Sequence, residues 1–290
     1  MPDVRIATCA EIPDLTTDDR VIVSALRDHG FTVEVSVWDD ASIDWSDTRL
    51  CVVRNTWDYH KKLDSFNAWL LKTDLVCPIL NGLDTMLWNS IKWYLHELKN
   101  RGVPIIDTIW IRQGQTIEVE EMLAKLSSDE IVIKPTIGAT AHLAARLRRD
   151  DAAAVADHLR AVLGHADAMV QPFIPSVLET GEISIMVFDG VFSHAVRKKP
   201  KQGDYRVQDD FGGSIERYEP DAQQISLAEH IAGEVRECAY ARIDLVQDDA
   251  GAWRVIEVEM IEPALYLAYG DHALRDFIET ITSRLQALPT

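Results

Sequence analysis

The chain has 290 residues and a formal charge of −18, which argues against a general surface for nucleic acid or anionic membranes. Hydrophobic residues make up 47% of the sequence, enough for a buried core, and no apolar run is long enough to span a bilayer. The N-terminus lacks the basic start and apolar stretch of a signal peptide. The four cysteines lie far apart without a CxxC pair, so we expect reduced thiols in a cytoplasmic protein.

The first part of the chain predicts alternating strands and helices. Strands are expected at Val4–Cys9, Phe31–Trp38 and Leu50–Val53, and helices at Asp19–His29 and Leu63–Lys72. This order is typical of a parallel sheet, where ligands gather at the carboxyl ends of strands. Two loops follow such ends, and the second, RNTWDY, could bind a small zwitterion or be a plain loop anchored by its tryptophan. The candidate substrate-binding residues in the two loops are Glu11, Arg54, Asn55, Trp57 and Asp58.

The middle of the chain predicts a second set of elements. Helices are expected at Asn89–Asn100, Ile117–Leu126 and Asp151–Leu163, and strands at Ile105–Ile111, Glu130–Pro135, Leu143–Arg148 and Ala168–Ile174. Pro172 interrupts the last strand, so we expect that strand at an edge or margin of its sheet. Small residues after Lys134 would let backbone amides approach phosphate oxygens, although Lys-Pro after a strand is more often a surface turn.

The last part of the chain predicts two hairpins and two helices. Asp189-Gly190 joins strands Glu182–Phe188 and Val191–Arg197. The remaining expected elements are a polar loop at Arg197–Gly213, a helix at Gln224–Ala239, strands at Arg242–Val246 and Trp253–Met260, and a helix at Leu274–Leu285.

The second hairpin carries a candidate metal site. Glu257 and Glu259 alternate along one strand and point to the same face, and Asp244 can reach that face if the register allows. Three converging carboxylates repel one another and lose hydration. A hard divalent cation such as Mg²⁺ resolves both problems; a solvated acidic face is the alternative.

Two further stretches could bind a nucleotide. Val170–Ile174 could offer a backbone edge to adenine, with Phe173 and Ile174 as apolar walls and the carboxylate of Glu179 near the ribose. Core packing is the competing interpretation. The stretch RKKPKQGDYR, from Arg197 to Arg206, concentrates cations that suit phosphate groups, or it is a solvated basic loop.

The order of these motifs resembles the ATP-grasp superfamily, on the side of glutathione synthetase and the ribosomal-protein glutamate ligase. The resemblance covers Asn89–Pro263 and rests on Lys92, IVIKP with Gly138, VQPFI, GEISIMVFDGVFSHAVRKKP, RIDLV and IEVEMIEP. It implies an α/β fold, α+β in the C-terminal half. A parallel-sheet domain at 1–88, a central lid domain at 89–172 and a mixed or antiparallel C-terminal domain at 173–290 would hold the nucleotide between them.

The resemblance also implies roles for individual residues. ATP would be bound by Lys92, Lys134, Gly138, Gln171, Phe173, Ile174, Glu179 and Lys199; the catalytic cations would be Arg197, Arg206 and Arg242; and Mg²⁺, or Mn²⁺, would be held by Asp244, Glu257 and Glu259. Many members carry Asn where this chain has Glu259, so its metal geometry departs from theirs. A segment from about Thr108 to Ala168 would close as a lid, because acyl-phosphates must be kept from water.

The implied activity is an ATP-dependent ligase. It would move the γ-phosphoryl group of ATP onto an oxygen of a carboxyl or ureido group in a small amino-acid-like substrate, form a C–N bond or a ring at the activated carbon, and release ADP and phosphate. The ending IEVEMIEP is also similar to that of ATP-grasp cyclo-ligases, which close O-ureido-D-serine to D-cycloserine in antibiotic biosynthesis. The alternatives are a ligase that extends a peptide or protein terminus and an ATP-binding regulatory module. A homodimer is a family expectation.

Overall fold

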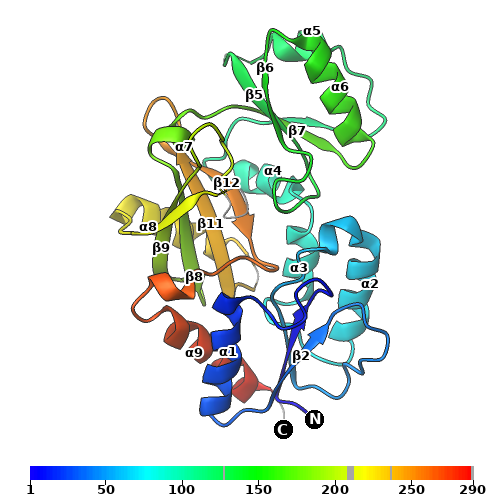
Figure 1. Ribbon diagram of the computed structural model, residues 1–290, viewed down its shortest axis with the longest axis vertical. Helices are drawn as coiled ribbons and strands as arrows, with labels where there is room; N and C mark the ends of the chain where they lie inside the picture. Colours follow the sequence, from blue (N-terminus) through cyan, green and yellow to red (C-terminus); the bar gives the residue numbers. More distant parts are fainter. Residues whose placement is uncertain (127, 208–211, 236, 289–290) are drawn as a thin grey trace.

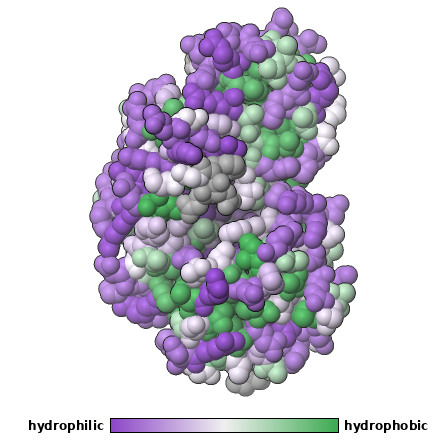
Figure 2. Space-filling view, viewed as in Figure 1, coloured by the Kyte–Doolittle hydropathy of each residue, from purple (hydrophilic) through white to green (hydrophobic). Residues whose placement is uncertain are grey.

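The computed structural model describes residues 1–126, 128–207, 212–235 and 237–288. Within these residues the chain forms three sheets, which follow one another along the long axis of the molecule (Figure 1). Their strand orders are β2-β1-β3, β4-β7-β5-β6 and β10-β9-β8-β11-β12. The outline narrows between the unit that carries the second sheet and the remainder of the molecule, as the space-filling view shows (Figure 2). No helix in the described ranges is both long and apolar enough to cross a membrane.

The first sheet is parallel, as predicted. Strand β1 (Val4–Thr8) lies between β2 (Val33–Val37) and β3 (Leu50–Val53). The helices of this part are α1 (Thr17–Asp28), α2 (Leu63–Asp74) and α3 (Leu83–Asn89), with a 3-10 turn at Tyr59–Lys61. The closing helix of the chain, α9 (Ala273–Ala287), lies beside α1, so the two ends of the chain share one core (Figure 1).

The second sheet is antiparallel. Its strands are β4 (Ile109–Ile111), β5 (Glu130–Pro135), β6 (Ala145–Arg148) and β7 (Ala168–Pro172), and the accompanying helices are α4 (Trp93–Asn100), α5 (Val119–Leu123) and α6 (Ala152–Leu163). The expectation that β7 lies at an edge was wrong, because it pairs with both β4 and β5. Pro172 is tolerated because it ends the strand, and β4 reaches only as far as Val170. The single helix expected at Asn89–Asn100 is also wrong, since α3 ends at Asn89 and Lys92 precedes α4.

The third sheet is antiparallel throughout and carries most of the site. Its strands are β8 (Glu182–Phe188), β9 (Val191–Lys199), β10 (Ser214–Tyr218), β11 (Tyr240–Gln247) and β12 (Trp253–Glu259), and its neighbours are α7 (Ser176–Glu179), α8 (Ala222–Gly233) and a 3-10 turn at Leu267–Tyr269. The sequence missed β10, and the loop expected at Arg197–Gly213 begins only at Pro200 because β9 continues to Lys199. Residues 208–211 of that loop lie outside the described ranges.

The two faces of this sheet differ because side chains alternate along each strand. One face is apolar and packs against α8 and α4, with Ile185, Ile243 and Val258 in that core. On the other face, at one end, Glu182 pairs in register with Lys198, Ser184 with Asp244, and Asp244 with Glu257. The fold therefore places the charged residues of four strands on one surface.

Strand β12 is the edge of the sheet, and its outer backbone groups are bonded by residues that precede the second sheet. The Asn89 side chain donates to the Val258 carbonyl at 2.8 Å and accepts from the Met260 amide at 2.8 Å. The Tyr94 hydroxyl accepts from the Val258 amide at 3.1 Å. These bonds satisfy an edge that would otherwise be open, and they fix the backbone on either side of Glu259.

Candidate active site

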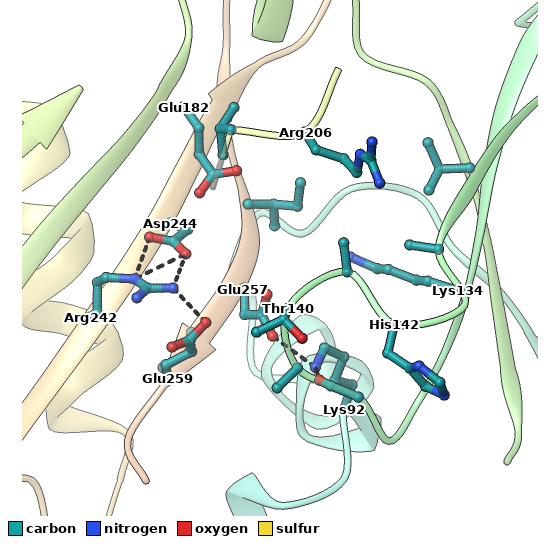
Figure 3. A pocket seen from close by; sticks show the side chains of 18 of the residues that line it. Lys92, Lys134, Thr140, His142, Glu182, Arg206, Arg242, Asp244, Glu257 and Glu259 are labelled. Carbon is teal, nitrogen blue, oxygen red and sulfur yellow. Dashed lines mark hydrogen bonds and ion pairs between the residues drawn. The ribbon is translucent and has the colours of Figure 1, made fainter. Parts of the chain in front are cut away.

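A cavity of about 330 Å³ lies where the three sheets meet. Its floor is the charged end of the third sheet, and its roof is the loop 136–144 between β5 and β6. Figure 3 shows part of its lining, with Lys92, Lys134, Arg206, Arg242, Asp244, Glu257 and Glu259 among the labelled side chains. The residues that line the cavity include twelve of the predicted site residues: Trp57, Lys92, Lys134, Gly138, Gln171, Phe173, Ile174, Arg206, Arg242, Asp244, Glu257 and Glu259.

Three carboxylates converge on the cavity floor. Carboxylate oxygens of Asp244, Glu257 and Glu259 all lie within 4.8 Å of one another, close enough to share one cation. The hairpin register that the sequence left open is Asp244 opposite Glu257 and Arg242 opposite Glu259. A bulge between Asp244 and Leu245 sets that register.

Basic side chains surround these carboxylates. The Arg242 guanidinium donates to Asp244 at 2.9 Å and also to Glu259 (Figure 3). The Lys92 ammonium lies 2.8 Å from a carboxylate oxygen of Glu257. Lys198 pairs with Glu182 and lies 3.5 Å from Asp244. The negative charge of the cluster is thus balanced from three sides within the protein.

The environment moves the pKa values of these acids in opposite directions. Burial opposes the charge on Asp244, but Arg242 and Lys198 hold its pKa well below the usual range. Burial likewise works against Glu257, and Lys92 with Lys134 brings its pKa below the ordinary value. Glu259 is different, because burial raises its pKa to about 7. The position where many relatives carry a neutral Asn therefore holds the acid that is easiest to protonate among these three.

The second lysine lies across the cavity from the carboxylates. Lys134, on β5, has no hydrogen-bond or ion-pair partner for its ammonium in the described part of the chain, and Figure 3 shows it reaching into the cavity. Burial, together with the charge of Lys92, lowers its pKa. Such a group favours an anion as its neighbour.

The roof loop approaches the floor closely. The Lys92 ammonium donates to the Gly138 carbonyl at 2.8 Å, so this lysine ties the loop to Glu257. Three non-glycine residues of the loop, Thr140, Ala141 and Leu143, have positive φ. His142 at its tip lies with its ring centroid 5.6 Å from that of His60, in the N-terminal part of the chain.

The expected adenine wall lines the far end of the cavity. Phe173 carries the Arg146 guanidinium 3.8 Å above its ring, and the Gln171 amide donates to the Thr108 hydroxyl at 2.9 Å. Glu179, expected at the ribose, is exposed on α7 and does not line the cavity.

Two of the expected cations point away. Arg197 lies against Tyr218 and pairs with Glu216 at 3.3 Å, and Lys199 shares its side of β9. The residue between them, Lys198, faces the carboxylates instead. Lys198 and its partner Glu182 were missed, although the alternation of side chains along RKK was a signal: only one parity can face the site.

The RNTWDY loop plays a different part from the one expected. Arg54 is fully buried and donates to Asp19 at 2.8 Å, Asn55 donates to Asp19 at 2.6 Å, and Asp58 accepts from the Trp38 indole at 2.8 Å. Of the loop's four candidates only Trp57 lines the cavity, and Glu11 remains exposed outside it. The loop is chiefly a buried polar framework.

The fold and the site together define an ATP-grasp ligase. Residues 107–265, more than half of the chain, match the family described as prokaryotic glutathione synthetase, ATP-grasp domain. The chain belongs to that ATP-grasp family. Residues 4–81 match the family described as D-cycloserine synthetase DcsG, N-terminal domain.

Three matches cover nearly the whole length of the chain. The cycloserine biosynthesis protein DcsG of Streptomyces lavendulae is 29% identical over 284 residues, which are 91% of this chain and 93% of that protein. The crystal structure of D-cycloserine synthetase DcsG has a TM-score of 0.89 at 26% identity, covering 97% of this chain and 99% of that one. D-alanine–D-alanine ligase from Bacillus anthracis, at 15% identity, a TM-score of 0.67 and 99% coverage of both chains, shows the shared fold alone. The predicted fold and enzyme class are confirmed; the domain boundaries and residue roles stay predictions.

Proposed function

We propose that this chain is an ATP-dependent carbon–nitrogen ligase that activates an acyl carbon of a small amino-acid-like substrate, and that it closes O-ureido-D-serine to D-cycloserine. The C–N bond of the ring forms at the activated carboxyl carbon as phosphate leaves, and water removes the carbamoyl group as carbon dioxide and ammonia. One observation carries the proposal. Three clustered carboxylates lie on one side of the cavity, and on the other side lies the ammonium of Lys134, which has no partner among the described residues. The similarity to DcsG over nearly the whole chain supports a small substrate rather than a peptide terminus.

The cavity suits Mg²⁺ and the phosphates of ATP. Oxygen donors of Asp244, Glu257 and Glu259 are the ligands that Mg²⁺ or Mn²⁺ prefers. PsnB, an ATP-grasp ligase of the same fold, was crystallised with Mg and ADP. When bound, the cation would neutralise phosphate charge. Arg242 bridges two of the three carboxylates, so its guanidinium must stay within reach of whatever they hold.

The remaining work falls on positioned charges and on the exclusion of water. Lys134 and Lys92 would bind phosphate oxygens, and Arg242 and Arg206, which both line the cavity, would stabilise charge on the transferred phosphoryl group. The roof loop, tied down through Lys92, would keep water from the activated substrate. No nucleophilic side chain is required by this chemistry. The cytoplasmic location and the homodimer stay predictions.

The test is product formation from defined substrates. ADP release is measured with ATP, Mg²⁺ and O-ureido-D-serine, and separately with pooled amino acids, while mass spectrometry follows the products. We expect ADP and D-cycloserine to appear together. ADP release that accompanies joined amino acids instead would replace the cyclo-ligase by an intermolecular ligase. The absence of ADP release with every substrate would count against the proposal.

A further inference from the structure

One acid of the cavity has no partner and no role in the chemistry above. Glu262 is 7% exposed, it lines the cavity, and its carboxylate has no hydrogen bond to another described residue and no ion pair with one. The other four acids on the cavity wall each have a cationic partner or a place in the carboxylate cluster. A buried carboxylate without compensation is costly. Burial, with the charge of Glu259 nearby, raises the pKa of Glu262 to about 8.

Side-chain hydrogen bonds fix the backbone on both sides of Glu262 and at Glu262 itself. Three consecutive carbonyls each accept a hydrogen bond from a different side chain: Ile261 from the Tyr240 hydroxyl at 2.8 Å, Glu262 from the Trp57 indole at 3.2 Å, and Pro263 from the Arg54 guanidinium at 2.6 Å. Two of these donors belong to RNTWDY, the loop that the sequence singled out for a small zwitterion.

These donors are themselves fixed. Arg54 is fully buried, paired with Asp19 and placed over the rings of Tyr240 and Phe277. The Tyr240 hydroxyl also lies 3.0 Å from the Val53 carbonyl, so its one proton is shared between this carbonyl at the end of β3 and that of Ile261. The loop after β3 and strand β11 thus fix the backbone that carries the Glu262 carboxylate, and a backbone fixed before ligand binding is what a recognition group needs.

We propose that Glu262 is the receptor for the ammonium group of the amino-acid substrate, with RNTWDY acting as the loop that positions it. This rests on the proposed function and names the subsite of its substrate. An ammonium supplies the charge and the hydrogen-bond donors that this carboxylate lacks. Tyr59, which also lines the cavity and lies within electrostatic reach of Glu262, forms part of the wall of the subsite.

The experiment compares Glu262→Gln with the wild type on O-ureido-D-serine and on its N-acetyl derivative, which lacks the positive charge. We expect the variant to raise the KM for O-ureido-D-serine at least about 10-fold, since hydrogen bonds to charged groups are worth roughly 1.5–3 kcal/mol. The KM for ATP and the Mn²⁺ affinity should stay within about twofold. The wild type should reject the N-acetyl derivative, and the variant should lose most of that preference. Glu120→Gln, an exposed acid on α5, is the matched control.

A second variant tests whether the position of the Glu262 carboxylate matters, in addition to its presence. Trp57→Phe keeps a ring but removes the donor to the Glu262 carbonyl. If the loop acts through Glu262, this change raises the KM for the amino acid alone, and it adds little in the double variant with Glu262→Gln.

Three results would overturn the assignment: an unchanged KM in Glu262→Gln, equal use of the N-acetyl derivative by the wild type, or a fall in Mn²⁺ affinity that makes Glu262 a metal ligand. Failure of the proposed function is distinguishable, because it appears in the wild type as an absence of ADP release with every amino acid, before any variant is made.

Discussion

Replacing Lys134 by Met tests whether this lysine binds ATP or stabilises the fold. Its ammonium has no bonded partner in the described residues, and burial together with Lys92 lowers its pKa. Removal of this charge should therefore leave the free energy of unfolding unchanged or slightly raised. A lysine on a phosphate makes charge-assisted hydrogen bonds worth roughly 1.5–3 kcal/mol. The Kd for ATP should consequently rise by about 10- to 150-fold.

The assay is a titration with a fluorescent ATP analogue, together with thermal unfolding of the same samples. Lys125→Met, an exposed lysine in the same unit, is the matched control and should change neither quantity. A Kd within about twofold of the wild type would refute the reasoning. A lowered Tm with unchanged nucleotide affinity would show instead that Lys134 supports the fold.

Two further predictions concern the stability of the folded chain. Arg242→Met leaves Asp244 and Glu259 without their shared cation, so in the presence of a chelator we expect a loss of roughly 3–5 kcal/mol in urea unfolding; a change below about 1 kcal/mol would show that the pair is not compensated by Arg242. Burial, reinforced by His142, Lys61 and Lys92, lowers the pKa of His60 to about 4, below an unfolded value of about 6.5. Its folded pKa is depressed, so the unfolded state takes up the proton first and stability falls as pH drops from about 6.5 to about 4, by about 3 kcal/mol in all. Neither ring nitrogen of His60 forms a hydrogen bond of good geometry with another described residue, so His60→Phe should be at least as stable at pH 7 and should lose this share of the acid sensitivity. Equal pH dependence of urea unfolding in the two proteins would contradict the prediction.

Local patterns predicted the strands of the site and the facing of its glutamates. Alternation alone puts Glu257 and Glu259 on one face, and the Asp189-Gly190 turn joins β8 to β9. The register between strands could not be derived in the same way. A bulge between Asp244 and Leu245 brings Asp244 opposite Glu257, and another between Met186 and Val187 decides which residues of β8 and β9 pair. Alternation along RKK indicates that either Lys198 or its two neighbours face the site, and the pairing of β8 with β9 decides for Lys198.

Contacts between distant segments could not be predicted from the sequence, for a different reason. Arg54 is a candidate for substrate binding in the sequence because RNTWDY follows the carboxyl end of a predicted parallel strand and combines a cation, an amide, an acid and aromatic residues. In the structure its partners are Asp19 and the carbonyl of Pro263, which is 209 residues away in the sequence. Neither the spacing of residues nor the composition predicts a pairing between such distant segments. Pro172 indicates an edge strand because proline has no N–H for a strand ladder. The strand is central all the same, because β4 reaches only as far as Val170, and the end of a neighbouring strand cannot be derived from the sequence of β7.

The central claim is that Asp244, Glu257 and Glu259 capture a divalent cation together with the phosphates of ATP. The most direct measurement is the affinity for Mn²⁺, followed by electron paramagnetic resonance in the presence of AMPPNP, in the wild type and in Glu257→Gln. The glutamine keeps an oxygen for Lys92 and so preserves the local bond. We expect the affinity to fall at least about 10-fold and ADP release to be lost while the Tm changes little. Equal Mn²⁺ affinity and unchanged turnover in the two proteins would contradict the account.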